Sequence, residues 1–184
     1  MSAITTIAIA ITALLFPTTS DAFSTIAQNA YTDWVANNGG NYEVSALLPS
    51  SEDPTNADVA VHWSIIDDKI HLAVAAEATG WLGFGFSEAG IMPGSDIAVF
   101  TTEGGVGTLT DAFATSYSTP KTDDQQDWTL NNYSLDGAFI IWEGERLLKT
   151  SDNQDLEIQD DSGVDMPPHK VIAAWGDDSA SMSY

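Results

Sequence analysis

The sequence contains no cysteine and very few basic residues. Lys and Arg together number 5 among 184 residues, against 27 Asp and Glu, so the formal net charge is −22. Because a surface of this sign repels polyanions, nucleic acid and anionic lipid are excluded as partners, whereas multivalent cations are attracted. The absence of cysteine excludes disulfides and thiol catalysis, so a fold outside the cell would depend on its core, a metal or a cofactor.

The common signatures of enzymes are absent as well. No Gly-x-Ser-x-Gly motif is present, and the glycines Gly83 and Gly85 lie in an expected strand instead of preceding a helix, which excludes a dinucleotide fingerprint. The three histidines, His62, His71 and His169, form no His-x-His or His-x-x-x-His pair. A copper or zinc site built from clustered histidines therefore has no local support.

The first 22 residues have the character of a signal peptide. An apolar run from Ile4 to Phe16 is followed by Ser20 and Ala22, the small residues that a signal peptidase recognises. The run is too short to span a bilayer, and no later stretch is apolar enough, so we expect no integral membrane span. The mature chain is expected to begin near Phe23 and to be secreted or extracytoplasmic.

Alternation of apolar and polar residues predicts an all-β fold, an antiparallel β-sandwich. Residues 23–40 are expected to be a lead-in segment, in which 25–35 fits either a short helix or irregular structure, and residues 41–184 the sandwich domain. Strands are expected at 59–65, 70–76, 82–86, 96–100, 106–113, 138–142 and 171–175. Turn residues separate these strands, and no long stretch has helical periodicity.

One expected strand has an unusual composition. Leu82, Phe84 and Phe86 alternate with Gly83 and Gly85, so one face carries large side chains and the other carries none. Glycine weakens a strand unless another backbone or a ligand must approach it closely. The bare face therefore fits tight packing by an opposing sheet, or the approach of a flat ligand.

Acidic residues lie in or beside several expected strands. Asp96 directly precedes an apolar run, and Asp111 and Asp127 lie near strand ends. A carboxylate that enters a core is costly unless it is paired, and a hard cation such as Ca²⁺ prefers oxygen ligands. The residues alone fit either a cation site or solvated strand ends that form local hydrogen bonds.

A methionine and a histidine flank the bare glycine face in sequence. Met92 lies in the loop that follows this strand, and His169 begins the last strand. Met and His together are an accepted pair of axial ligands for haem iron. The alternative interpretation is an exposed loop methionine and a surface histidine.

Several segments together resemble the DOMON domain, of the type that lies N-terminal in dopamine β-monooxygenase-like copper monooxygenases. The resemblance covers roughly residues 40–176, and its motifs are GWLGFGFS at 80–87, Met-x-Gly-x-Asp-Ile at 92–97, Thr-Asp-Ala at 110–112, Asp-x-Gln-Gln-Asp-Trp at 123–128, Asp-x-x-Asp-Leu at 152–156 and VIAAWG at 171–176. It implies an immunoglobulin-like β-sandwich in an extracytoplasmic module.

The same resemblance implies two kinds of site. In the copper-monooxygenase branch the sandwich can hold a metal ion, whose ligands here would be the Asp96 and Asp127 carboxylates with the carbonyls of Ile97 and Ala112. Calcium is the expected ion, and sodium or potassium could take its place. Haem-binding members use the methionine of the Met-x-Gly motif, Met92 here, with a histidine near the final strand.

This sequence also departs from the branch. Residues 150–153 read Thr-Ser-Asp-Asn where branch members typically have a cysteine that ties the domain to the enzyme body, and the histidine-rich copper domains are absent. We therefore expect no hydroxylase activity from this chain alone. The expected function is a secreted, non-catalytic module that binds a small molecule or supports a neighbouring redox or enzyme domain. The alternative is a haem b electron-transfer domain.

Overall fold

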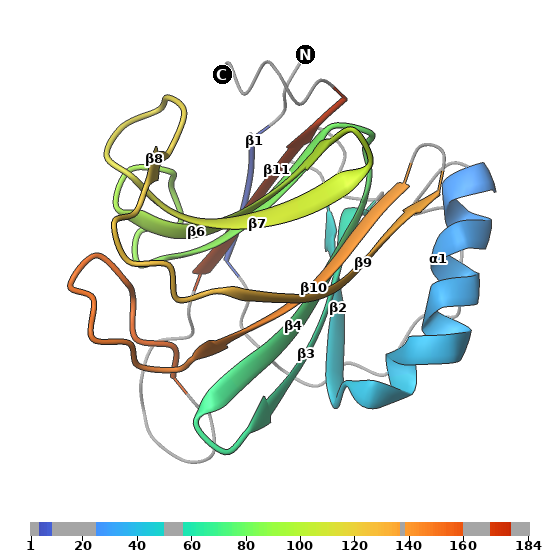
Figure 1. The fold of residues 1–184 in the computed structure, drawn as a ribbon, viewed down its shortest axis with the longest axis horizontal. Helices are drawn as coiled ribbons and strands as arrows, with labels where there is room; N and C mark the ends of the chain where they lie inside the picture. Colours follow the sequence, from blue (N-terminus) through green and yellow to red (C-terminus); the bar gives the residue numbers. More distant parts are fainter. Residues whose placement is uncertain (1–3, 9–24, 50–56, 137–138, 160–169, 178–184) are drawn as a thin grey trace.

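Two antiparallel sheets packed against each other form the fold (Figure 1). In this computed structural model the described residues are 4–8, 25–49, 57–136, 139–159 and 170–177. The six-stranded sheet has the order β1-β11-β5-β6-β7-β8, and the five-stranded sheet has the order β2-β3-β4-β10-β9. The all-β sandwich expected from the sequence is confirmed.

The expected strands are all present, and the structure adds others. The first sheet contains β1 (Ile4–Ala8), β5 (Trp81–Ser87), β6 (Ser95–Glu103), β7 (Val106–Ala114), β8 (Lys121–Thr122) and β11 (Lys170–Gly176). The second contains β2 (Val44–Pro49), β3 (Ala57–Ile66), β4 (Lys69–Glu77), β9 (Thr129–Asp136) and β10 (Phe139–Leu147). The alternating pattern did not identify β1, β2, β8 or β9.

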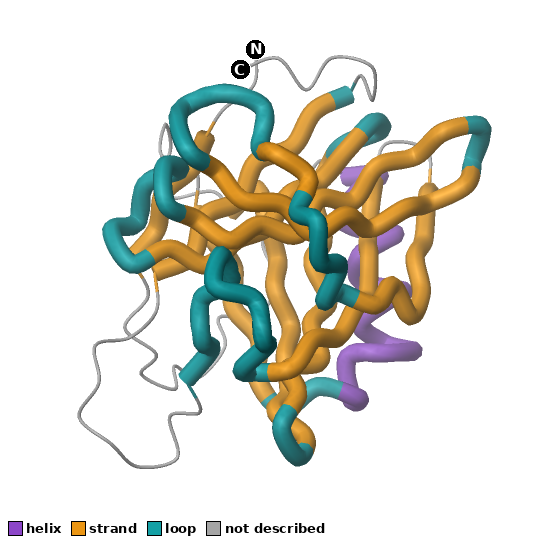
Figure 2. The backbone as a smooth tube through the Cα atoms, turned by 60° about the vertical axis from the view of Figure 1, so that its left-hand side comes forward, coloured by secondary structure: helices purple, strands orange, loops and turns teal. Residues whose placement is uncertain are grey.

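A helix covers the outer face of the five-stranded sheet (Figure 2). Helix α1 (Thr25–Asn38) is followed by the short 3-10 helix η1 (Gly39–Asn41). Trp34 of the helix is buried against Ala60, Ala73 and Ile141 of the sheet. Of the two possibilities for the lead-in segment, the helix is therefore the one observed, and its apolar side packs on the sandwich.

The main core lies between the sheets, and the glycine-rich strand β5 contributes to it from one side only. Leu82, Phe84 and Phe86 belong to the buried cluster that fills the interior. Gly83 and Gly85 consequently face outward, on the opposite side of the six-stranded sheet, because alternate residues of a strand point to opposite faces. The bare face is thus the outer face of this sheet and does not pack on the other sheet.

The first described strand lies within the expected signal peptide. Strand β1 pairs antiparallel with β11, with Ile4 opposite Ala174 and Ala8 opposite Lys170. Removal of residues 1–22 would leave that side of β11 without this neighbour. In the described part of the chain, no helix has the length and apolar character needed to cross a membrane.

Candidate functional site

The loop between β5 and β6 is held so that Met92 lies over the bare glycine face. The hydroxyls of Ser87 and Ser95, one at each end of the loop, donate to the carbonyl of Ile91 at 2.8 and 2.7 Å. Gly94 has a φ of 81°, which favours glycine, and its N–H donates to a carbonyl of β7 at 2.7 Å. Met92 is only 2% exposed, so the loop buries the thioether instead of presenting it to solvent.

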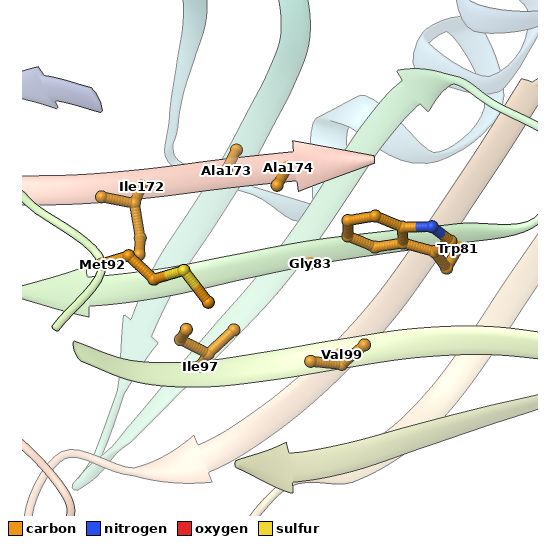
Figure 3. Close-up of a pocket in the computed structure, with 8 residues that line it drawn as sticks. All are labelled: Trp81, Gly83, Met92, Ile97, Val99, Ile172, Ala173 and Ala174. Atoms are coloured by element: carbon orange, nitrogen blue, oxygen red, sulfur yellow. The ribbon is translucent and has the colours of Figure 1, made fainter. Parts of the chain in front are cut away.

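An apolar pocket lies beneath Met92 on this outer face (Figure 3). Its lining residues are Trp81, Gly83, Met92, Ile97, Val99, Ile172, Ala173 and Ala174. Gly83 forms the floor, because a β-carbon added there would lie 3.7 Å from its nearest neighbour. Gly85 is covered instead, since a β-carbon added there would lie 2.6 Å from the carbonyl oxygen of Asp96.

The pocket is small and has no titratable group in its lining. Its cavity volume of about 20 Å³ leaves room for roughly one water-sized group. The lining residues therefore form an apolar binding site that contains one polarizable sulfur, that of Met92. No lining residue can act as a catalytic acid or base. Of the two expected haem ligands, Met92 lies in the lining of this pocket, and His169 lies outside the described residues.

A buried ion pair occupies one end of the interior between the sheets. Nη1 of Arg146, from β10, lies 2.5 Å from Oδ2 of Asp96, from β6. The same Asp96 oxygen accepts the backbone N–H of Leu156 at 2.9 Å, and Nη2 of Arg146 donates to the carbonyl of Leu156 at 2.8 Å. These contacts tie the segment after β10 to both sheets.

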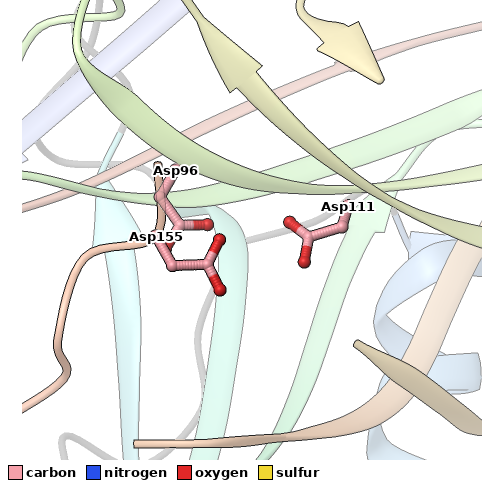
Figure 4. Close-up of side chains that lie close together, drawn as sticks. All are labelled: Asp96, Asp111 and Asp155. Carbon is pink, nitrogen blue, oxygen red and sulfur yellow. The ribbon is translucent and has the colours of Figure 1, made fainter. Parts of the chain in front are cut away.

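Two more carboxylates join this pair. Oxygens of Asp96, Asp111 and Asp155 lie within 4.8 Å of one another (Figure 4). One buried oxygen of each carboxylate has no hydrogen-bond partner, although Oδ2 of Asp155 lies 3.5 Å from Arg146. Burial raises the pKa of Asp111 to about 7 and that of Asp155 to about 6. Three carboxylates against one guanidinium leave an excess of negative charge in a poorly solvated place, which favours a cation or protons.

The four expected metal ligands are distributed around this cluster. Asp96 is a member of it, and Ile97 and Ala112 are register partners on β6 and β7. The carboxylate of Asp127 accepts hydrogen bonds from Nε2 of Gln125 at 2.8 and 3.1 Å, while its backbone N–H donates to Oδ2 of Asp111 at 3.0 Å. The structure thus brings Asp96 and Asp111 together and links Asp127 to them through its backbone.

Sequence reasoning missed Arg146 and Asp155 as members of the cluster. Arg146 continues the inward-facing alternation of Ile140 and Trp142 along β10, so a strand extended past Trp142 would have placed its side chain in the core. Asp155 lies in irregular structure after that strand, and the Asp-x-x-Asp-Leu motif that contains it does not indicate where its side chain lies.

Gln126 explains part of the Gln-Gln-Asp motif in structural terms. Its side-chain oxygen accepts the N–H of Asp111 at 2.9 Å, and its Nε2 donates to the Asp111 carbonyl at 3.0 Å. Nε2 also donates to the Asp123 carbonyl at 2.9 Å. The amide therefore takes the place of a neighbouring strand beside β7 and fixes Asp111 at the cluster.

The chain belongs to the DOMON domain family, whose model matches residues 55–167. This match spans more than half of the chain and contains β3 to β10, the apolar pocket and the acidic cluster, apart from the part of the pocket on β11. The resemblance inferred from the motifs is thereby confirmed.

Curated relatives carry monooxygenase names. The chain is 34% identical over 98 residues to "DBH-like monooxygenase protein 1" of Homo sapiens, an alignment that covers 53% of this chain and 16% of that protein. It is 29% identical over 110 residues to "MOXD1 homolog 2" of Drosophila melanogaster, covering 58% of this chain and 14% of that protein. The matched region is therefore a small part of each relative.

Among solved structures, the chain is similar to the cytochrome domain of Myriococcum thermophilum cellobiose dehydrogenase. The TM-score is 0.41 with 12% sequence identity, and the match covers 48% of this chain and 47% of that one.

Proposed function

We propose that this chain is an exported, non-catalytic DOMON module that binds a small apolar molecule and serves as an accessory domain of a copper-monooxygenase-like protein. The observation that carries the proposal is the apolar pocket over Gly83, which the sandwich builds on its outer face and Met92 covers. Glycine at this position weakens the strand, because it gives no side chain to pack. A binding site for a ligand on this face would explain why the sequence has glycine here.

The accessory role is supported by the relatives. Their names describe monooxygenases, and this chain aligns with 14% and 16% of the lengths of the fly and human proteins. The catalytic part of such a protein would be supplied by another segment or partner. The chain incubated with copper, ascorbate, oxygen and a phenethylamine is expected to give no hydroxylated product, and turnover would overturn the non-catalytic assignment.

Ligand binding can be tested at Met92 itself. With the methionine methyl groups labelled with ¹³C, titration with dissolved xenon, a small apolar probe, is expected to shift the Met92 resonance saturably. Gly83→Val, which places two methyl groups in the pocket, should abolish that shift, whereas Thr115→Val at an exposed position should leave it unchanged. Absence of a saturable shift in the parent chain would mean that the pocket does not take apolar molecules.

A second proposal concerns a structural cation at the acidic cluster. The buried oxygens without partners on Asp96, Asp111 and Asp155 support it, because hard cations bind several oxygens at once. Calcium best offsets the excess charge, and sodium or potassium fits the same oxygen donors. The candidate ligands are the Asp96 and Asp127 carboxylates with the carbonyls of Ile97 and Ala112.

Thermal unfolding tests the cation. At matched ionic strength, calcium is expected to stabilise the folded chain over chelator by about 2.7 kcal/mol at a hundredfold excess over Kd. Asp127→Asn should remove this response if Asp127 is a ligand, and Asp111→Asn should remove it if the ion sits within the cluster. Asp124→Asn, an exposed aspartate of the same loop, is the control. Equal melting temperatures with calcium and with chelator would exclude the site.

The alternative function, haem b electron transfer, has Met92 in its favour. The Met92 thioether faces an apolar pocket, where it could act as an axial ligand. The cavity is too small for the haem macrocycle, so the loop that carries Met92 would have to move before haem could bind. Haem would supply one-electron transfer there. Reconstitution should give a low-spin spectrum that Met92→Ala and His169→Ala abolish and His71→Ala does not. A spectrum that survives either of the first two changes would remove this ligand pair.

A further inference from the structure

Strand β9 carries the triplet Asn132-Tyr133-Ser134. It is the only Asn-x-Ser/Thr triplet with a non-proline middle residue in the sequence. Such a triplet is the acceptor for N-linked glycans in the secretory pathway. Because no second acceptor is present, any N-linked glycan on this chain has one possible position.

The strand presents both essential residues of the triplet to solvent. Asn132 and Ser134 are exposed, and Tyr133 between them is half-buried. The Tyr133 ring packs 5.5 Å from that of Phe100 in the core, and its hydroxyl donates to the carbonyl of Gly105 at 3.4 Å. Successive residues of a strand point to opposite faces. Because Tyr133 points inward, Asn132 and Ser134 both point outward.

The amide of Asn132 can accept a sugar without losing its contact in the fold. Its Nδ2 donates one hydrogen bond, to Oε1 of Glu143 at 3.0 Å. Glycosylation replaces one of the two amide hydrogens, so the other remains free to donate to Glu143. The modified side chain is therefore compatible with the position seen here.

We infer that Asn132 carries an N-linked glycan, an inference that rests on the export included in the proposed function. The bond formed joins Nδ2 of Asn132 to C1 of the sugar. The bond broken joins that carbon to the diphosphate of a lipid-linked oligosaccharide, which leaves as lipid diphosphate while the amide gives up one proton. The donor is supplied by the secretory pathway.

A glycan at this place would protect the edge of the sheet. Strand β9 is the last strand of the five-stranded sheet as described, and it contains neither Lys nor Pro, two residue types that commonly block edge pairing. Leu135 on this strand is 40% exposed. A bulky hydrophilic group at Asn132 would prevent another strand from adding there.

Mass spectrometry of the protein from its native source tests the inference. Amidase release of the glycan in heavy-oxygen water should leave labelled aspartate at position 132. When the full chain is expressed through a eukaryotic secretory pathway, Ser134→Ala should abolish the glycosidase-sensitive mass, and Ser134→Thr and Asn131→Gln should keep it. Unmodified Asn132 in the native protein would overturn the inference.

The N-terminus of the same sample separates this failure from failure of export. Unmodified Asn132 in a chain that begins near Phe23 would refute the glycan and leave export standing. Unmodified Asn132 in a chain that still begins with Met1 would refute both.

Discussion

Arg146 and Asp96 form an ion pair that links the two sheets through the interior of the sandwich. The side chains are 0% and 1% exposed, and Nη1 lies 2.5 Å from Oδ2. The guanidinium also lies 5.4 Å from the centroid of the Trp128 ring, within cation–π distance. Arg146 is therefore the counter-ion around which the buried carboxylates gather.

Removal of this guanidinium should be strongly destabilising. Arg146→Met keeps much of the side-chain volume but leaves Asp96, Asp111 and Asp155 without their positive partner. Breaking a buried ion pair leaves a charge buried without a partner. The free energy of unfolding is therefore expected to fall by about 3–5 kcal/mol in urea titrations at neutral pH. Nearby protons or a cation could reduce the loss by neutralising the carboxylates, so the titration should include chelator.

An exposed pair provides the matched control. Lys149 lies 2.7 Å from Glu157, but the two side chains are 72% and 49% exposed. Lys149→Met should cost at most about 1 kcal/mol, because water already screens this pair. If the two variants lost similar amounts of unfolding free energy, burial would not be the reason for the contribution of the Arg146 ion pair to stability.

The cluster should also impose a pH dependence on the metal-free protein. Burial raises the pKa of Asp111 from 3.8 to about 7, so the folded chain holds a proton that the unfolded chain has released over this range. The contribution of Asp111 to the free energy of unfolding should therefore fall as pH rises from about 4 to about 7 in chelator. Asp111→Asn should flatten this trend relative to the parent, and the exposed Asp124→Asn should not. A trend that is the same in all three proteins would contradict the raised pKa.

The alternation of apolar and polar or small residues predicted most of the strands. It is visible in β3, β4, β5 and β6 because each of these strands buries one face against the other sheet. Strand β9 was missed for a local reason. The register between β9 and β10 shifts at Glu143/Gly144, so Asn131 has no direct partner and the inward residues Leu130 and Tyr133 are three apart. An extra residue of this kind breaks the two-residue period by which a strand is identified.

The candidate site could be predicted only in part, since its members come together through long-range pairing. Asp96 was identifiable because it directly precedes an apolar run, and Asp111 because it lies in the expected strand 106–113. Asp155 lies near them because its neighbour Leu156 is hydrogen-bonded to both Asp96 and Arg146. The hydrogen bond between Leu156 and Asp96 joins residues that are 60 positions apart in the sequence. No local pattern encodes such an approach, so Asp155 could not be assigned.

The two glycines of β5 should respond oppositely to alanine. At Gly83 the added carbon would be 3.7 Å or more from its neighbours, an ordinary contact, so Gly83→Ala should be neutral or stabilise by about 0.4–1 kcal/mol. At Gly85 it would lie 2.8 Å from Cγ1 of Ile97 and closer still to the Asp96 carbonyl, so Gly85→Ala should destabilise by about 1–3 kcal/mol. Thermal unfolding measures both, and equal effects would contradict an open floor at Gly83.

His62 anchors helix α1 to the sheet in its neutral form. It is 5% exposed, and the Tyr31 hydroxyl lies 2.8 Å from its Nε2. The ring of Trp34 meets it edge-on at a centroid distance of 5.1 Å. Tyr31 and Trp34 both come from the helix, so a charge on His62 would arise directly beneath it.

Acid should therefore loosen the helix. Burial lowers the pKa of His62 from 6.5 to about 4, so its contribution to stability is fully present above pH 6.5 and is lost as pH falls toward about 4. The protection factors of the α1 amides, which correct for the slower intrinsic exchange in acid, should fall across this window before those of the core strands. His62→Gln, which cannot take up a proton, should remove that acid-dependent loss of protection, whereas His71→Gln on the neighbouring strand should retain it. If the parent and His62→Gln show the same acid dependence at α1, protonation of His62 does not control the docking of the helix.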